Sequence, residues 1–196
     1  MNEINIPERI ESELPQVQEF RSFPKIARLS RECIITEKID GSNAQLTIKD
    51  GQIVSVGSRN RFINLQSDNF GFARWVDQNK EELLKLGDGT HFGEWWGLGI
   101  QRGYGLFERR FSLFRVPKDL VELPQCVFIV PKLWEGEFGT GEIDRILQRL
   151  VSNGSYAAPG FMKPEGIVIY HKAAGVMFKK TIDGDEKPKG ATNESA

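Results

Sequence analysis

A tight turn between two alternating segments is the feature that most limits the folds open to this chain. Residues 45–49 and 52–58 largely alternate apolar and polar side chains, as strands with one buried face do. Asp50 and Gly51 connect them, and an Asp-Gly pair in this setting is the strongest short-range signal of a β-hairpin. The sequence therefore predicts antiparallel sheet.

Further segments have the composition of strands or of loops. The predicted strands are rich in β-branched and aromatic residues, which favour a pleated, half-buried surface. They span residues 32–37, 91–97, 110–116, 127–130, 166–170 and 176–181. Two glycine-rich segments, residues 98–105 and 136–141, are predicted as loops.

Two segments place apolar residues at the spacing of a helix. The first covers residues 68–86, with Ser67 or Asp68 as its N-cap and Gly87 at its end. The second follows Thr140, which is predicted to cap it, and has apolar side chains at i, i+3, i+4, i+7 and i+8. Many strands and two amphipathic helices together predict an α+β domain.

The two ends of the chain differ in composition from its middle. Residues 1–20 mix acids with spaced apolar residues, and this predicts a partly helical arm that packs on the domain. After Asp183 the chain is polar and rich in Gly, Pro and charged residues, which predicts a disordered tail. The predicted organisation is one domain over residues 1–182 and a tail over residues 183–196.

The net charge and the cysteine content indicate how the protein could bind nucleic acid and in which compartment we expect it. The formal net charge of −1 means that nucleic acid must be bound by a local basic patch and not by a global field. Cys33 and Cys126 form no disulfide framework and have no metal-ligand spacing, as in a reducing compartment. The sequence shows no signal peptide and no apolar run of about 18 residues, so we expect a cytoplasmic protein without membrane contact.

The stretch of residues 37–43, Glu-Lys-Ile-Asp-Gly-Ser-Asn, lies between two predicted strands. A lysine between two acids is unusual for packing and is better suited to chemistry, because an unprotonated lysine is a nucleophile. Gly41 would let the backbone approach a phosphate or adopt a positive φ. The alternative is an exposed, charged hairpin turn.

Other polar residues also suit a phosphate or nucleotide site. Arg59 and Arg61 follow the second hairpin strand, and a guanidinium matches the geometry of an oxyanion, although two solvated arginines would look the same. Glu94 lies in an otherwise apolar strand, where a buried acid could bind a ribose hydroxyl; the alternative is an outward-facing strand residue.

These motifs resemble the covalent nucleotidyltransferase superfamily. Lys-x-Asp-Gly at Lys38, preceded by Glu and followed by Ser-Asn, is similar to the nucleotidyl-lysine motif of its RNA ligase branch. The other motifs of that family follow in the same order. They are Gly93-Glu94 with the glycine-rich loop after it, the strand over residues 110–116, Glu165-Gly166 and the lysines near residue 180. The resemblance implies a minimal nucleotidyltransferase domain with two largely antiparallel β-sheets enclosing a nucleotide cleft, helices outside, and an ATP-grasp-like arrangement.

The resemblance also implies a role for each matching residue. Lys38 would attack the α-phosphate of ATP, Glu165 would hold Mg²⁺ or Mn²⁺, and Phe114, or else Phe111, would stack on adenine. The family ends in Lys-x-Lys, whereas Lys179 and Lys180 are adjacent here and should point to opposite faces of a strand, with Thr181 on the Lys179 face. The implied catalytic residues are Lys38, Glu94, Glu165, Lys179 and Lys180, and the implied nucleotide-binding residues are Glu37, Ile39, Asn43, Arg59, Glu94, Phe114 and Lys179.

The implied function is ATP-dependent ligation of RNA. AMP would pass from Lys38 to a 5′-phosphate end, and a 3′-hydroxyl would then displace it. The implied partners are RNA ends, or else a nicked duplex or DNA. A partner protein could supply the binding of these ends. The rival interpretations are a DNA ligase or capping-type guanylyltransferase, which usually carry a further oligonucleotide-binding domain, and a non-catalytic nucleotide- or RNA-binding module. His91 and His171 are interpreted as structural.

Overall fold

The computed structural model describes residues 21–185. The predicted arm over residues 1–20 and the tail from residue 186 lie outside the described residues. Within residues 21–185, no helix is both long enough and apolar enough to cross a lipid bilayer.

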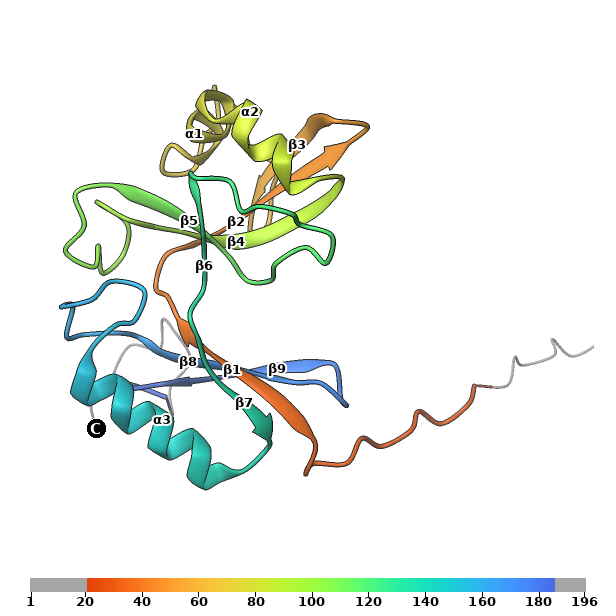
Figure 1. The fold of residues 1–196 in the computed structure, drawn as a ribbon, viewed down its shortest axis with the longest axis vertical. Coiled ribbons are helices and arrows are strands. Elements are labelled where there is room, and N and C mark those ends of the chain that lie inside the picture. Colours follow the sequence, from red (N-terminus) through yellow and green to blue (C-terminus); the bar gives the residue numbers. More distant parts are fainter. Residues whose placement is uncertain (1–20, 186–196) are drawn as a thin grey trace, which may run out of the picture.

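Two sheets make up the fold, and they lie one above the other in Figure 1. The five-stranded sheet has the order β3-β2-β4-β5-β6 and is antiparallel except for the β5–β6 pair. Its strands are β2 (Ser42–Lys49), β3 (Gln52–Ser58), β4 (Gly89–Gly97), β5 (Arg109–Leu113) and β6 (Val127–Ile129). The four-stranded sheet has the order β7-β1-β8-β9 and is antiparallel throughout. Its strands are β1 (Glu32–Lys38), β7 (Lys132–Glu137), β8 (Gly166–His171) and β9 (Val176–Thr181). The predicted α+β class with two largely antiparallel sheets is confirmed.

Helices cover one face of each sheet (Figure 1). The helical elements on the five-stranded sheet are α1 (Phe72–Gln78), α2 (Lys80–Leu83) and the 3₁₀ turn η1 (Leu84–Leu86). The four-stranded sheet packs on α3 (Thr140–Asn153). Each interface is a separate apolar cluster, and no helix of residues 21–185 packs on the opposite face of either sheet.

The Asp-Gly hairpin is confirmed. Asp50 and Gly51 have φ of 52° and 68°, the conformation of a type I′ turn. Their amides donate to the carboxylate of Asp88, the residue before β4, at 2.8 and 3.2 Å, so this side chain holds the turn. Asn and Asp tolerate a positive φ better than other residues with a Cβ, which explains the choice of Asp.

The predicted helix over residues 68–86 is shorter and is interrupted. Phe70 and Gly71 have φ of 50° and 76°, so helical geometry begins only at Phe72. Asp68 still serves the helix start, because its carboxylate accepts the amides of Ala73 and Arg74. At Asn79 φ is −114°, which separates α1 from α2.

Three other boundaries differ from prediction. Thr140 is the first residue of α3 and not its cap, since Gly139 occupies the N-cap with no side-chain bond. The strand predicted over residues 110–116 ends at Leu113. Residues 136–137, predicted as loop, belong to β7, where Gly136 pairs with Cys33 of β1. Pairing with a neighbouring strand, rather than local composition, makes β7 a strand.

A third apolar cluster lies where the chain passes between the sheets. It contains Ile39 and Trp96, together with Tyr104, Val130 and Ala158. The chain crosses from one sheet to the other at residues 39–41 and again at residues 130–131 (Figure 1). Side chains near these crossings therefore come from both sheets.

Candidate active site

Lys38 is the last residue of β1 and begins the first crossing between the sheets. Its Nζ donates to Oε2 of Glu165 at 2.6 Å, and the two side chains are 21% and 3% exposed. Glu165 precedes β8, and its neighbour Gly166 lies directly opposite Lys38 in the β1–β8 pair. The register of two adjacent strands thus brings the predicted nucleophile and the predicted metal ligand together.

Glu94 adds a second buried carboxylate from the five-stranded sheet. Its Oε1 accepts the amide of Gly41 at 3.0 Å, and its Oε2 accepts Nδ2 of Asn43 at 3.1 Å. Burial raises the pKa of Glu94 to about 7; the charge of Lys38 acts against this rise, and the charges of Glu165 and Asp40 add to it. The alternative of an outward-facing strand residue is wrong, because Glu94 is 8% exposed.

Gly41 is required by close packing and not by a positive φ. A Cβ at this position would lie 2.6 Å from the Trp95 carbonyl oxygen and 2.7 Å from Cβ of Trp96. Glycine is therefore the residue that lets the turn after Lys38 lie directly against β4. The predicted positive φ at Gly41 is absent, and the predicted approach to a phosphate stays a prediction; the close approach that the structure shows is to β4.

The carboxylate of Glu37 points away from Lys38, as alternation along a strand requires. It is 1% exposed and accepts Oγ of Ser155 at 2.6 Å and the amides of Tyr156 and Ala157 at 2.8 and 2.9 Å. Burial raises the pKa of Glu37, and these three hydrogen bonds lower it. The side chain of Glu37 thus secures the loop after α3, and only its main chain is left to face a nucleotide.

The two lysines of β9 lie on opposite faces, as predicted. Lys179 pairs with Val168, which pairs with Thr36, two residues before Lys38 on the same face of β1. Lys180 pairs with Ile167 on the face that packs on α3, and its Nζ lies 3.8 Å from Oδ1 of Asp144. Lys179 therefore shares the face of Lys38, and Lys180 does not.

The two candidate aromatic residues are also separated by strand alternation. Phe111 is fully buried and packs on Phe72, with ring centroids 5.0 Å apart. Phe114 is 46% exposed, and its amide donates to the Phe92 carbonyl, which extends the β4–β5 ladder. Because Ser112 lies opposite Glu94, Phe114 two residues later is on the Glu94 face.

The two predicted arginines differ in their contacts. Arg61 donates to the main chain and Oγ of Ser67 and to the main chain of Asp68, so it holds the 58–68 loop. Arg59 is exposed and directly follows Ser58, which lies opposite Ala44 in β2. Arg59, and not Arg61, is left available for a ligand near Asn43. Ile39 is 4% exposed in the cluster between the sheets.

Sequence reasoning missed two residues of the glycine-rich 98–105 loop. Nε of Arg102 donates to Oδ2 of Asp40 at 3.1 Å, and the Tyr104 hydroxyl accepts the amide of Asp40 at 2.8 Å. Both bonds fasten the turn that follows Lys38. The only signal in the sequence was that Arg102 and Tyr104 lie among glycines. This does not reveal that Arg102 bonds to Asp40, 62 residues away.

The carboxylates suit a cation that prefers oxygen ligands, such as Mg²⁺ or Mn²⁺, better than a metal that prefers nitrogen or sulfur ligands. Within residues 21–185, no group of three or more His, Cys, Asp or Glu side chains converges as a complete metal cage. Mg²⁺ needs only one or two carboxylates when phosphate oxygens and water supply the other ligands. Glu165, beside Lys38, and the nearby Glu94 fit that requirement.

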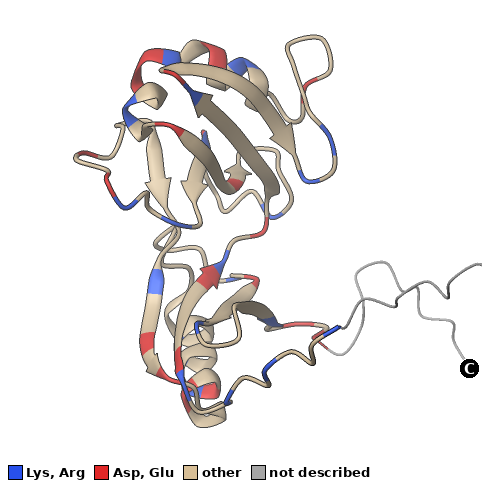
Figure 2. Ribbon diagram, turned by 90° about the vertical axis from the view of Figure 1, so that its right-hand side faces the viewer, with Lys and Arg blue, Asp and Glu red and all other residues tan. Residues whose placement is uncertain are grey.

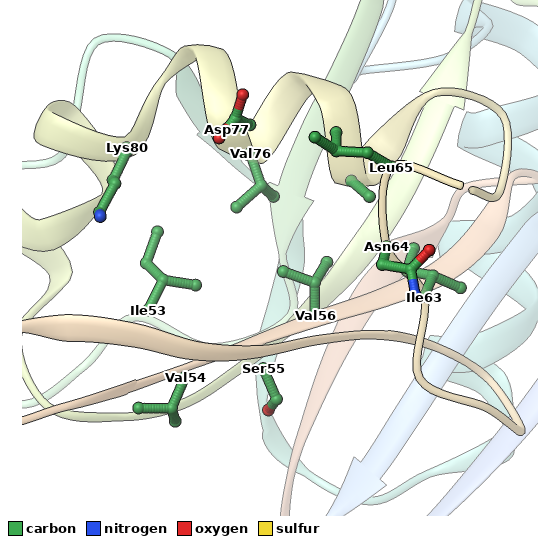
Figure 3. A pocket seen from close by; sticks show the side chains of 11 residues that line it. Ile53, Val54, Ser55, Val56, Ile63, Asn64, Leu65, Val76, Asp77 and Lys80 are labelled. Atoms are coloured by element: carbon green, nitrogen blue, oxygen red, sulfur yellow. The ribbon is translucent and has the colours of Figure 1, made fainter. Parts of the chain in front are cut away.

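Two cavities lie away from the predicted site residues. One of about 300 Å³ lies between β3, residues 63–65 and α1, lined in part by Val56 and Leu65 (Figure 3). Another of about 660 Å³ lies beside Trp75 and Arg109. Neither contains a predicted site residue in its lining. Acidic and basic residues are mixed over both sheets and are not segregated by sign, in keeping with the net charge of −1 (Figure 2).

Comparison with known proteins identifies the fold. Three solved structures of a Naegleria gruberi RNA ligase are similar: a variant with AMP and Mn (TM-score 0.58, 23% identity), a variant with ATP and Mn (0.58, 23%) and the ligase with PPi (0.56, 24%). Each match covers 78% of this chain and 50% of that chain, so this chain spans about half the length of those structures. No match was found among curated protein sequences.

The family comparison covers most of the chain. The RNA ligase family model matches residues 31–181, which include every residue of the site described above. This range also contains both sheets and every helical element of the part of the chain that the structure describes. The chain belongs to the RNA ligase family.

Proposed function

We propose that this chain is the nucleotidyltransferase part of an ATP-dependent RNA ligase that works through a lysyl-AMP intermediate on Lys38. The observation that carries the proposal is the convergence of Lys38, Glu94 and Glu165. Lys38 and Glu165 are 127 residues apart in the sequence and 2.6 Å apart in space. Glu94 is bonded to the turn that follows Lys38.

Three displacements at phosphorus make up the reaction. In the first, Nζ of Lys38 forms a bond to the α-phosphorus of ATP while the bond to the β-phosphate breaks, and pyrophosphate leaves. In the second, an oxygen of an RNA 5′-phosphate takes AMP from Lys38. In the third, an RNA 3′-hydroxyl attacks that phosphate and AMP leaves. Positioning and charge neutralisation are what a protein contributes to such steps.

The proton of Lys38 has a nearby acceptor. A lysine attacks only as the neutral amine, and Oε2 of Glu165 is the carboxylate oxygen bonded to its Nζ. Glu165 is therefore placed to hold this proton and to orient Nζ. A divalent cation held by Glu165 and Glu94 would supply positive charge beside the phosphate oxygens. The Mn in the similar ligase structures supports Mg²⁺ or Mn²⁺ here.

The open faces of the two sheets supply groups for the nucleotide. Phe114, on the Glu94 face, is exposed enough to stack on a purine. Glu94 has acceptor oxygens for a ribose hydroxyl, and Asn43 is bonded to it. Lys179 and Arg59 are the exposed cations that we assign to phosphate oxygens.

Incubation with ATP and a divalent cation, followed by intact-mass measurement, tests the proposal. We expect one AMP to be added to the wild type and none to Lys38→Ala. The bond should be broken by acid and should survive alkali, as a phosphoramidate does. GTP and NAD⁺ serve as controls for the nucleotide. An adduct that persists in Lys38→Ala would refute the assignment of the nucleophile.

RNA ends are the proposed substrate of the second and third steps. An assay with a 5′-phosphorylated RNA, a nicked duplex and the equivalent DNAs would rank them by the rate of joining. Low salt is required, because phosphate contacts weaken steeply as salt rises. A protein that is adenylated but joins none of these ends would point instead to another acceptor for AMP.

A further inference from the structure

The candidate site is divided between the two sheets. Lys38 and Glu165 belong to the four-stranded sheet, and Glu94 belongs to the five-stranded sheet. The chain itself connects these sheets only at residues 39–41 and 130–131 within the part that the structure describes. The distance from Glu94 to the Lys38–Glu165 pair therefore depends on how firmly the sheets are held together near the first crossing.

Arg102 makes a further connection at this place. It lies in the 98–105 loop, which leaves the five-stranded sheet after β4. Its Nε donates to Oδ2 of Asp40 in the crossing, and its Nη1 donates to the main-chain oxygens of Lys163 at 2.9 Å and Pro164 at 3.4 Å. One guanidinium thus joins the turn after Lys38 to the segment that delivers Glu165.

Tyr104 holds the same loop in place. Its hydroxyl accepts the amide of Asp40, and its ring packs on Trp96 and Phe161 at centroid distances of 4.9 and 4.6 Å. Phe161 belongs to the segment that leads to Glu165, so the ring of Tyr104 connects β4 of the five-stranded sheet to that segment. Tyr104 itself has a φ of 53°, which a residue with a Cβ adopts only when its surroundings hold it there.

We propose that Arg102 is a positioning residue that sets the placement of Glu94 relative to Lys38 and Glu165. It would do so by tying Asp40 to the residues immediately before Glu165. The proposal rests on the proposed function, because the geometry it maintains is that of lysine adenylation. Arg102 is hydrogen-bonded to Asp40 and to the 163–164 main chain, and we assign its effect on the site to these contacts.

The chemistry of arginine explains why this residue type suits the position. A planar guanidinium can donate from separate nitrogens to a carboxylate on one side and to carbonyls on another. Its charge also offsets that of Asp40, two residues after Lys38. A lysine could keep the charge but would bond in one direction at a time. An ordinary surface ion pair would contribute little to either stability or rate.

The test compares Arg102→Gln and Arg102→Lys with a matched control, Arg145→Gln. Arg145 is an exposed arginine of α3 that pairs with Glu142 and lies outside the site. Formation of lysyl-AMP is followed over a range of ATP concentrations, with thermal unfolding and hydrogen exchange measured on the same proteins. We expect Arg102→Gln to lower the rate at saturating ATP at least about tenfold, a change of about 1.4 kcal/mol in the barrier. The ATP concentration for half-maximal rate should change less than about threefold.

The other variants show whether position or fold is affected. Arg102→Lys should recover only part of the rate, and Arg145→Gln should match the wild type. The Tm of Arg102→Gln should stay close to that of Arg145→Gln. Exchange should become faster at the amides of Asp40 and Gly41, which donate to Tyr104 and Glu94, and across residues 161–165.

The proposal would be overturned if Arg102→Gln forms lysyl-AMP at the wild-type rate, or if only the ATP concentration for half-maximal rate changes. An equal fall in rate in Arg145→Gln would also overturn it. If the wild type forms no adduct at all, the proposed function fails by itself. Hydrogen exchange then decides about Arg102: faster exchange at residues 39–41 and 161–165 in Arg102→Gln supports the connection, and unchanged exchange refutes it.

Discussion

The covered and the open faces of the sheets use the same strands for different purposes. On the covered face of the four-stranded sheet, Ile35 and Ile167 pack on α3, and the one acid, Glu37, has protein donors for both carboxylate oxygens. On the open face, one residue further along the same strand, Lys38 is partly exposed and bonded to Glu165. The covered face satisfies its polar groups internally, and the open face keeps groups available for a ligand.

The five-stranded sheet repeats this division. Phe111 of β5 is buried against the helices, whereas Ser112 and Phe114 lie on the face of Glu94. Neighbours in sequence therefore separate into one residue packed under the helices and one on the face of Glu94. The comparison predicts that substitutions on the covered faces change the free energy of unfolding, and that substitutions on the open faces change nucleotide chemistry.

Loss of Lys38 should produce the largest effect and should affect only one step. Lys38→Ala should reduce adenylation by about a thousandfold or more, because no other nucleophile replaces the amine. The same variant should still join an RNA supplied with a pre-adenylated 5′ end, since Lys38 is no longer the nucleophile there. Gel assays with both substrates check this. Equal failure with both would show that Lys38 does more than carry AMP.

Phe111 and Phe114 give the clearest contrast within one strand. Phe111→Ala should destabilise the fold by about 3–5 kcal/mol, because it opens a cavity in the aromatic core. Phe114→Ala should leave unfolding nearly unchanged and weaken nucleotide binding by about 1–3 kcal/mol, while Phe114→Tyr keeps binding. Urea unfolding and ATP titration measure the two effects. If Phe111→Ala weakens binding without loss of stability, the faces are assigned wrongly.

Glu94 should make stability depend on pH in an unusual direction for a carboxylate. Its folded pKa of about 7 lies above the ordinary value of 4.5, so the native state binds more protons than the unfolded state between these values. The free energy of unfolding should therefore fall as pH rises from about 5 to about 7, and level off above, by up to about 3 kcal/mol. Glu94→Gln should remove this fall. Urea unfolding of both proteins across this range is the measurement, and parallel curves would contradict the raised pKa.

Glu37 should behave as a structural residue despite its place beside Lys38. Glu37→Gln can keep its one acceptor oxygen on the amides of Tyr156 and Ala157, but its own amide then faces the Ser155 hydroxyl, which loses its acceptor, at a cost of about 1–3 kcal/mol of unfolding free energy. Adenylation measured well below the Tm should be nearly unchanged. A large fall in rate with normal stability would place the Glu37 side chain in the nucleotide site.

The smallest expected contrast is between the two lysines of β9. Lys179→Ala should slow adenylation by about tenfold, since it removes a charge from the face of Lys38. Lys180→Ala loses only a partly exposed contact with Asp144 and should change stability by less than about 0.5 kcal/mol. Single-turnover rates at saturating ATP distinguish them. The reverse order would mean that Lys180 turns toward the phosphates in the working enzyme.

Several features were predictable because neighbouring residues encode them. The Asp50-Gly51 hairpin follows from a turn that favours positive φ at both positions. The helical spacing of apolar residues identified α1 and α3. The start of α1 at Phe72 and the break at Asn79 depend on backbone angles, which this spacing does not indicate. The segment around Lys38 could be recognised because its residues are contiguous.

Only the tertiary structure decided which groups meet. Sequence order alone left Lys179 and Lys180 open as candidates, and the β8–β9 register separates them by face. It suggested that Glu37 binds the nucleotide, whereas its side chain is bonded to the loop after α3. Sequence order also contained no sign that Arg102 is bonded to Asp40 in the crossing between the sheets. Turns and periods arise from residues within a few positions of each other, and these contacts depend on strand register and on how two sheets pack, which the whole chain determines.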